Sequence, residues 1–535
     1  MKEAREHNPW LAMTVLSLGL FMTLLDLTIV NIAVPSILSD LHASLDQVLW
    51  VLNGYSLFYA VLLITSGRLG DYFGPRNLFA LGIVVFTLAS AFSGLAQNAG
   101  ELIVSRGLQG LGAAILAPQS LPIMLSLFPP ARRGGVFAIY GVLAGIAVLA
   151  GPTLGGWLVT TFGWRWIFYV NLPIGLLTFV LALRFVPDLR IGLRHRLDWL
   201  GVLLVTGGLL GVVFGLIEGE RYQWGQVAGF VSIPLIIACG VALLAVFLLQ
   251  QARRQDSEPL VPFAVFADRN FTVMAIVLCA VGFAILGVFL PLTIFFQSVL
   301  GLSAVAAGLT VAPQPVAMML TSGIAGGLSQ KVSGKYLLIP GLLLFAAGTA
   351  YIAWAAHADA SRWTFLPGLI VSGFGMGFVW TPVFSLATRD LRPELAGVAS
   401  GVINTIQELG TVVASAAVGA LLQNRLAVAL HDQAVHYSAA LPAFAREPFI
   451  AGFASAARNG FQVGRGENGA SLPHAFAALG NAVFTHAFSD AMRATLPLPI
   501  AVILVAAALT LFSRAGGAAA QPEPAAVPEK QPIAV

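Results

Sequence analysis

Long apolar stretches separated by short polar segments dominate the chain. A bilayer core is about 30 Å thick and needs about 20 apolar residues per spanning helix, and about fourteen stretches are long enough. The first is too long for a cleavable signal peptide. The pattern predicts membrane-spanning helices over residues 10–35, 47–66, 77–96, 99–128, 135–162, 166–186, 199–217, 227–249, 271–300, 305–328, 336–356, 365–387, 396–422 and 496–512.

Composition indicates the same class of protein. Of the 535 residues, 58% are hydrophobic and 10% are charged, whereas about 25% are charged in soluble domains. Water-soluble folds could not bury so much apolar surface, so we expect an all-α polytopic membrane protein. A net charge of +4 is too small to indicate nucleic-acid binding. Cys239 and Cys279 lie in apolar stretches and offer no disulfide framework or cysteine metal site.

Basic residues indicate the orientation of the chain. Most of the 28 Lys and Arg residues fall in alternate connecting segments, which are expected to face the cytoplasm. An even number of spans with both termini cytoplasmic fits this pattern. The sequences GRLGDYFGPR (residues 67–76) and GGLSQKVSGK (residues 326–335) follow the second and tenth spans and align without gaps, which indicates a duplicated bundle.

These observations predict four regions. Residues 1–195 form an N-terminal six-helix bundle, residues 196–254 a two-helix insert, and residues 255–514 a C-terminal six-helix bundle. Within the last region, residues 424–495 are expected to form an external loop with some amphipathic helix. The Pro-rich residues 515–535 predict a disordered cytoplasmic tail.

Three ionisable residues lie inside predicted spans, namely Asp26, Arg106 and Glu408. A charge there costs about 2.5–3.5 kcal/mol and usually faces the protein interior or a watery cavity. At about 1.5 Å per residue, Asp26 and Arg106 lie at similar depth and can pair. Desolvation favours the protonated form of a carboxylate, so Asp26 and Glu408 are candidates to carry protons or bind a cation. The alternative is a structural ion pair, with Glu408 hydrogen-bonded to Asn404 or Gln407 on its own helix.

A proline inside the fifth predicted span suggests a bend. In AGPTLGG (residues 150–156), Pro152 removes a helix hydrogen bond and favours a kink. Gly151 and Gly155 form a G-x-x-x-G face that lets another helix approach closely. The alternative is a role in packing alone.

The segment at residues 67–76 suggests a latch. Asp71 can cap the start of the following helix, while Arg68 and Arg76 can pair with carboxylates. Such contacts could hold the cytoplasmic side in one state. The alternative is that these residues only set the topology.

Six motifs resemble those of a known family of transporters. The chain is similar, over nearly its whole length, to the fourteen-helix drug:proton antiporter branch of the major facilitator superfamily, which includes the QacA-like and EmrB-like exporters. The motifs, in order, are LDLTIVNIAVP (residues 25–35), GRLGDYFGPR (67–76), RGLQGLGAA (106–114), AGPTLGG (150–156), WRWIFYVNLPIG (164–175) and PLTIFFQSVLGLSAVAAGL (291–309).

The resemblance implies roles for residues by position. Asp26 and Arg106 would act in proton coupling. Glu408 would be a second proton or cation site, because some relatives have Arg-Gln where this chain has Gln407-Glu408. The cytoplasmic gate would comprise Gly67, Arg68, Gly70, Asp71, Gly74 and Arg76, and the antiporter helix kink would comprise Gly151, Pro152, Gly155 and Gly156.

The sequence therefore predicts proton-coupled efflux of small amphipathic organic compounds or drugs across the plasma membrane by alternating access. The expected partners are the small-molecule substrate, protons and the lipid bilayer, and no nucleic acid; the sequence does not indicate whether an accessory export protein exists. The proton gradient would drive transport without a cofactor. Polar or aromatic candidates to line the central cavity are Asn31, Asn53, Gln109, Gln314, Trp380 and Asn404.

Three other functions compete with this prediction. A proton-coupled transporter of one specific metabolite, including an importer, is the nearest alternative. A membrane enzyme would need converging nucleophiles, bases or metal ligands in the spans, and the sequence suggests none. A channel is disfavoured by titratable groups inside the spans and by the absence of a filter-like repeat.

Overall fold

The computed structural model describes residues 8–43, 45–188, 198–219, 221–255, 259–329, 331–392, 395–458 and 474–514. The first half of the chain forms α1 (Pro9–Asp40), α2 (Leu45–Phe73), α3 (Pro75–Leu95), α4 (Ala99–Leu116), η1 (Ala117–Gln119), α5 (Ser120–Leu127), α6 (Pro130–Phe162), α7 (Trp166–Tyr169), α8 (Asn171–Phe185), α9 (Trp199–Glu218) and α10 (Ile233–Ala252). A small antiparallel sheet of β1 (Gln226–Ala228) and β2 (Val231–Ser232) precedes α10.

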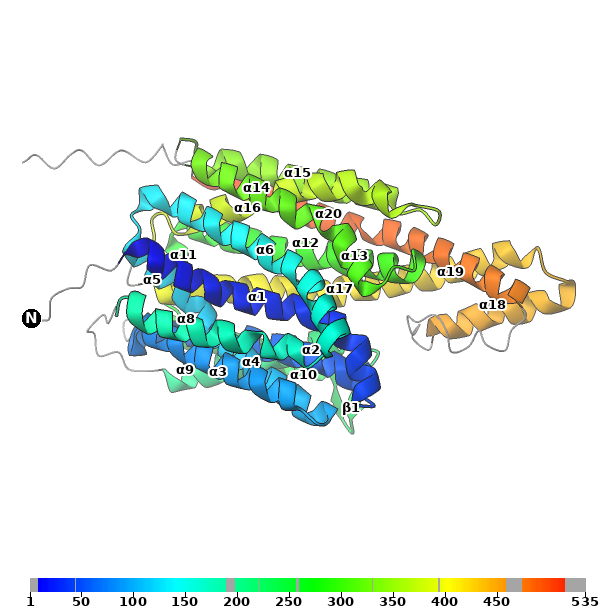
Figure 1. The fold of residues 1–535 in the computed structure, drawn as a ribbon, viewed down its shortest axis with the longest axis horizontal. Coiled ribbons are helices and arrows are strands. Elements are labelled where there is room, and N and C mark those ends of the chain that lie inside the picture. The colour runs from blue at the N-terminus through cyan, green and yellow to red at the C-terminus, as the bar shows by residue number, and fades with distance from the viewer. Residues whose placement is uncertain are drawn as a thin grey trace, which may run out of the picture.

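The second half is also helical (Figure 1). Its elements are α11 (Ala264–Ala267), α12 (Arg269–Ile294), the π-helix η2 (Phe295–Val299), α13 (Ala304–Val311), α14 (Pro313–Leu328), α15 (Gly334–Ala355), the short η3 (Arg362–Phe365), α16 (Leu366–Ala387), α17 (Ala396–Ser438), α18 (Ala443–Arg458), α19 (His474–Thr495) and α20 (Pro497–Thr510).

Among the described residues, 14 helical segments are long and apolar enough to cross a membrane, which confirms the predicted fold class. Polar side chains fix where several of them start. The Asn8 side chain accepts a hydrogen bond from the Trp10 amide at the start of α1, and Asn98 accepts one from Glu101 at the start of α4. An even number of spans returns the chain to the end of the bundle at which it began. Which membrane side that end faces stays a prediction.

The spans pack as two groups with an additional pair (Figure 1). In the first group α1 packs along α6, and α4 packs between α2 and α3. In the second group α12 packs against α17 and α20, and α16 against α14 and α15. The pair α9 and α10 lies against α2 and α17 through α9. The two groups meet where α6 packs on α14 and α2 packs on α17. The predicted boundary at residue 195 lies outside the described residues, as does the predicted tail at 515–535.

The segment expected to be an external loop is largely helical. α17 continues past Asn424 to Ser438 and packs against α18 and α19, and this helical arm extends beyond the end of the bundle (Figure 1). The reason is an apolar stripe, since Leu426 and Leu430 of α17 are buried in one cluster with Phe488 of α19. Residues 459–473 of the predicted loop lie outside the described part.

Candidate functional site

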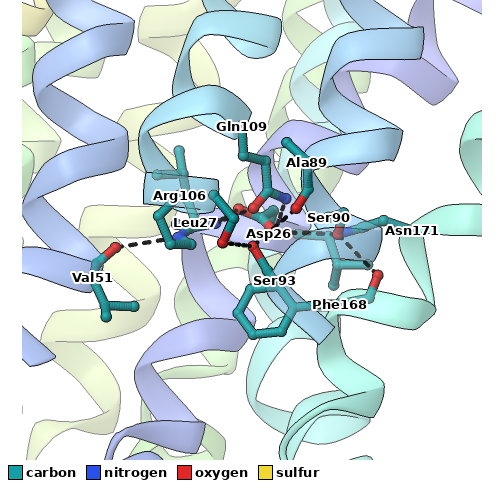
Figure 2. Close-up of polar contacts among 12 residues, drawn as sticks. Asp26, Leu27, Val51, Ala89, Ser90, Ser93, Arg106, Gln109, Phe168 and Asn171 are labelled. Carbon is teal, nitrogen blue, oxygen red and sulfur yellow. Dashed lines mark hydrogen bonds and ion pairs between the residues drawn. The ribbon is translucent and has the colours of Figure 1, made fainter. Parts of the chain in front are cut away.

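Three side chains donate hydrogen bonds to the carboxylate of Asp26 in α1 (Figure 2). Arg106 Nη1 lies 2.5 Å from Asp26 Oδ2, and Gln109 Nε2 lies 2.6 Å from Oδ1. Asn171 Nδ2 lies 3.1 Å from the same Oδ1. All four side chains are fully buried, with relative exposures of at most 1%. The ion pair that the depth argument predicted is therefore present.

The guanidinium of Arg106 is held on all sides. Its Nε donates to the Val51 carbonyl of α2 at 3.2 Å, and Nη1 also donates to Gln109 Oε1 at 2.7 Å. The ring of Tyr55 lies over it, 4.6 Å from Cζ to the ring centroid, and the ring of Phe168 lies 5.9 Å away. A buried charge is tolerated only when it is paired and hydrogen-bonded, and this arrangement meets that condition.

Asn171 belongs to this site, and sequence reasoning gave it no role. It is the first residue of α8, and its Nδ2 also donates to Ser90 Oγ at 3.0 Å. Ser90 Oγ in turn donates to the Phe168 carbonyl at 2.9 Å. The signal was available, because Asn171 is an uncharged polar residue within the apolar motif WRWIFYVNLPIG.

A central cavity of about 490 Å³ lies between the two groups of helices. Both groups contribute to it, through α1, α2, α6, α12, α14, α16 and α17. Three of the predicted cavity residues line it, namely Gln314, Trp380 and Asn404. Asp26 and Arg106 are not among its lining residues, whereas Tyr55 is. Tyr55 therefore lies between the cavity and the buried ion pair.

The other predicted cavity residues lie elsewhere. Asn31 is exposed and donates to the Leu27 carbonyl at 2.9 Å, so its amide is engaged on its own helix. Asn53 precedes Tyr55 by two residues, which turns it about 200° around α2 from the side facing the cavity. Gln109 shares a helix face with Arg106 and is bonded to Asp26 instead.

Glu408 of α17 is half-buried and does not line the cavity, although Gln407 does. It lies close enough to Tyr59 of α2 to interact with it electrostatically. The Asn404 amide donates to the Ser400 carbonyl at 2.8 Å. Within the described residues Glu408 makes no hydrogen bond to Asn404 or Gln407, so the structural alternative for this residue has no support.

The segment at residues 67–76 pairs its arginines as predicted. Arg68 Nη1 lies 3.5 Å from Asp71 Oδ2, and Arg76 Nη2 lies 3.2 Å from Asp188 Oδ2. The capping prediction for Asp71 is wrong, because Gly74, with φ of 90°, occupies the N-cap of α3.

Residues of this segment also contact the second group of helices. The carboxylate of Asp71 packs against Gly397 at the start of α17. A Cβ on Gly67 would lie 2.6 Å from the Gly397 carbonyl oxygen, so α2 and α17 approach backbone to backbone. Gly70 leaves room for the side chain of Gln119, whose Nε2 donates to the Ser66 carbonyl at 2.8 Å.

A contact between the two groups that sequence reasoning missed lies at the start of α6. Arg133 Nη1 donates to the Thr388 carbonyl, just past the end of α16, at 2.8 Å. Its side chain is buried, and its Nε donates to the Phe128 carbonyl at 3.3 Å. The preceding Arg132 is exposed, so the pair Arg132-Arg133 in the sequence does not reveal which arginine joins the two groups.

The proline-containing segment of α6 is packed on both sides. Gly151 and Gly155 face Thr28 and Ile29 of α1, as the G-x-x-x-G pattern predicted. On the other side Gly156 faces Val305, and Pro152 packs against Gly308 of α13. α6 is one helix from Pro130 to Phe162 with Pro152 inside it, and the bend there stays a prediction.

Comparisons with known proteins agree with this architecture. The model of the Major Facilitator Superfamily matches residues 16–198 and 195–415. An uncharacterized MFS-type transporter of Mycobacterium tuberculosis is 37% identical over 83% of this chain and 77% of its own length. The tetracenomycin C resistance and export protein of Streptomyces glaucescens is 31% identical over 98% of this chain and 94% of its own. The crystal structure of the human organic anion transporter MFSD10 has a similar fold, with a TM-score of 0.58, 14% identity and coverage of 93% of this chain and 99% of that chain.

Proposed function

Because the chain belongs to the Major Facilitator Superfamily, we propose that it exports small amphipathic organic molecules across the plasma membrane in exchange for protons. It is a multi-pass membrane protein of the fourteen-helix drug-exporter type. The export direction is supported by the relative from Streptomyces glaucescens, which is named as an export protein and aligns over 98% of this chain. Exchange for protons is supported by one observation, the buried carboxylate of Asp26 beside Arg106. No cofactor is needed, since the proton gradient would supply the energy.

Protonation of Asp26 would remove the negative charge that pairs with Arg106. A neutral carboxyl group no longer attracts the guanidinium, while Arg106 keeps its charge. Arg106 would retain its bonds to the Val51 carbonyl and to Gln109 and its contact with the ring of Tyr55. Because Tyr55 lines the cavity, a movement of the guanidinium would also move the Tyr55 ring and so change its contact with a bound substrate.

Alternating access would use the two contacts between the groups of helices. α6 packs on α14, and α2 packs on α17 at Gly67 and Gly397. Both contacts lie at one end of the bundle, where α2 and α14 end and α6 and α17 begin. Rocking of one group against the other around the central cavity would open both contacts together. The buried bond from Arg133 to Thr388 would have to break during this motion, so it belongs to one state.

Inside-out membrane vesicles test the proposal directly. A pH gradient is imposed across vesicles containing the protein, a dye reports the lumenal pH, and candidate compounds are added outside. Exchange predicts that a substrate discharges the gradient and accumulates inside, and that vesicles with Asp26→Asn do neither. An importer would instead accumulate its substrate only in right-side-out vesicles. No response to a broad compound panel, with insertion of the protein confirmed, would contradict the proposal.

A further inference from the structure

The central cavity carries no formal charge. In the part of the chain that the structure describes, none of its lining residues is Asp, Glu, Lys, Arg or His. The Asp26 and Arg106 side chains are fully buried outside it, and Glu408 is not part of the lining, although it lies beside the lining residues Tyr55 and Tyr59. A charged ligand would lose its water here without a charged side chain in the lining to pair with. The lining therefore favours an uncharged ligand.

Three aromatic rings in the cavity wall lie nearly parallel. The rings of Trp380 and Phe384 in α16 have centroids 5.8 Å apart and an interplanar angle of 5°. Phe137 of α6 continues the row, with its centroid 5.6 Å from that of Phe384 and an angle of 25°. All three line the cavity, so both groups of helices contribute to one aromatic wall, in which the rings are stacked in a row. Offset stacking on such a wall favours a flat aromatic ligand.

Three polar atoms at the cavity have no hydrogen-bond partner among the described residues, namely Gln314 Oε1 and the hydroxyls of Tyr55 and Tyr140. The side chains of Gln314 and Tyr55 are the more deeply buried, at 2% and 1% exposed. Both residues line the cavity, from α14 and α2. A buried polar group without a partner is destabilising, so each is a natural position for a ligand hydrogen bond. Gln314 Oε1 can only accept, and the tyrosine hydroxyl can also donate.

We propose that the cavity binds a flat, uncharged polycyclic molecule with hydroxyl and carbonyl groups at its rim. Its rings stack on Phe137, Phe384 and Trp380, a hydroxyl donates to Gln314 Oε1, and a carbonyl accepts from the Tyr55 hydroxyl. The volume of about 490 Å³ suits a ligand of this size, since ligand pockets typically measure about 300–1,000 Å³. This assignment of substrate class rests on the proposed export function but is tested by binding alone.

The test uses the full-length protein in lipid nanodiscs, with empty nanodiscs subtracted. Three probes share one ring system: 2,6-dihydroxyanthraquinone, whose hydroxyl groups are too far from its carbonyls to bond to them, anthraquinone without hydroxyl groups, and the dihydroxy compound carrying a trimethylammonium group. Equilibrium binding should show the dihydroxy probe bound about tenfold more tightly than the other two, the difference expected for one hydrogen bond or one unpaired charge. In Gln314→Met, which keeps the shape but removes the acceptor, the preference for hydroxyl groups should disappear.

Variants at Phe384 test the contribution of the aromatic wall to binding. Phe384→Leu should weaken binding of all three probes, and Phe384→Tyr, which keeps the ring, should restore it. Phe444→Leu, at a position 83% exposed on the helical arm, is the matched control and should bind like wild type. The proposal is overturned if the cationic probe binds as tightly as the neutral one, or if neither Gln314→Met nor Phe384→Leu changes affinity.

Failure of this proposal and failure of the proposed function give different results. If vesicles exchange protons for cationic compounds only and the dihydroxy probe does not bind, the substrate class is wrong and export stands. If the probe binds as described and moves no protons in vesicles, proton exchange is wrong and the binding site stands.

Discussion

The ring of Tyr55 lies over the guanidinium of Arg106, 4.6 Å from Cζ, while the same side chain lines the central cavity. Within the described residues, Arg106 also contacts the ring of Phe168 and bonds to the side chains of Asp26 and Gln109. None of these three lines the cavity. Tyr55 is therefore the contact through which a bound substrate would sense the charge state of the Asp26–Arg106 pair.

Tyr55→Leu is expected to uncouple proton movement from substrate transport. Loss of a buried cation–π contact is worth about 2 kcal/mol, and the substrate would lose its link to Arg106. The number of protons moved per substrate in reconstituted vesicles should fall below the wild-type value. Tyr55→Phe keeps the ring, so it should keep the proton ratio while binding substrate more weakly. A wild-type ratio in Tyr55→Leu would rule out this role.

Asp26→Asn is expected to abolish proton-driven export, because an amide cannot take up the proton. It also leaves the guanidinium of Arg106 without its counter-charge, which costs about 3–5 kcal/mol at a buried site. The melting temperature in detergent should therefore fall. The double variant Asp26→Asn/Arg106→Gln removes both charges and should regain stability without regaining export. Wild-type drug resistance in Asp26→Asn at equal expression would contradict the coupling role.

Much of the fold and part of the site could be predicted from the sequence. The spans follow from apolar length alone, and the Asp26–Arg106 pair follows from depth, because helix rise per residue is constant. Asn171 was missed because its partner Asp26 is far away in the chain, and residue spacing says nothing about contacts between distant segments. Some amphipathic helix was expected in residues 424–495, but the extent of the helical arm was missed, because α17 continues beyond the length that a membrane requires.

Glu408→Gln tests whether Glu408 carries a second proton or binds a cationic substrate. The carboxylate is not part of the cavity lining, although it lies beside the lining residues Tyr55 and Tyr59, so affinity for the neutral dihydroxy probe should stay at the wild-type level. If Glu408 carries a proton, the variant should move fewer protons per substrate in proteoliposomes. Selective loss of cationic substrates would instead identify Glu408 as a cation site. Equal loss of cationic and neutral substrates would indicate a structural role.

Asp198, at the start of α9, connects the two helices of the insert by hydrogen bonds to the end of α10. Its carboxylate accepts hydrogen bonds from the Gly201 amide at 3.0 Å, from Gln250 and Gln251 at 2.8 Å each, and from Arg254 at 2.7 Å. Burial raises the pKa of Asp198, but these hydrogen bonds and the charge of Arg254 outweigh it and hold the pKa below its usual value.

The stability that Asp198 contributes should therefore depend on pH. A lowered pKa in the folded state means that the contribution is complete above the unfolded value of about 3.9 and is lost as pH falls through the folded value. The melting temperature of wild type should exceed that of Asp198→Asn by a constant amount between about pH 7 and 5, and the gap should close below about pH 4. Asp390→Asn, at an exposed carboxylate, is the control and should show no such gap. A gap independent of pH would contradict the argument.

Gly67 allows α2 and α17 to approach backbone to backbone at the end predicted to be cytoplasmic. A Cβ there would lie 2.6 Å from the Gly397 carbonyl oxygen, and backbone atoms cannot give way as a flexible side chain can. Overpacking typically costs about 1–3 kcal/mol, and opening this end relieves it. Gly67→Ala should therefore favour the state open at this end by about tenfold.

Labelling of a cavity cysteine measures that shift. Asn404→Cys lines the cavity, and in a background with Cys239 and Cys279 replaced by Ala it would be the single thiol of the chain. An impermeant maleimide added to inside-out vesicles should label it faster with Gly67→Ala than without. Gly419→Ala lies on α17 where a Cβ meets nothing within 4 Å, so it should leave the rate unchanged. Equal labelling rates in all three proteins would show that the contact of Gly67 with Gly397 does not keep this end closed.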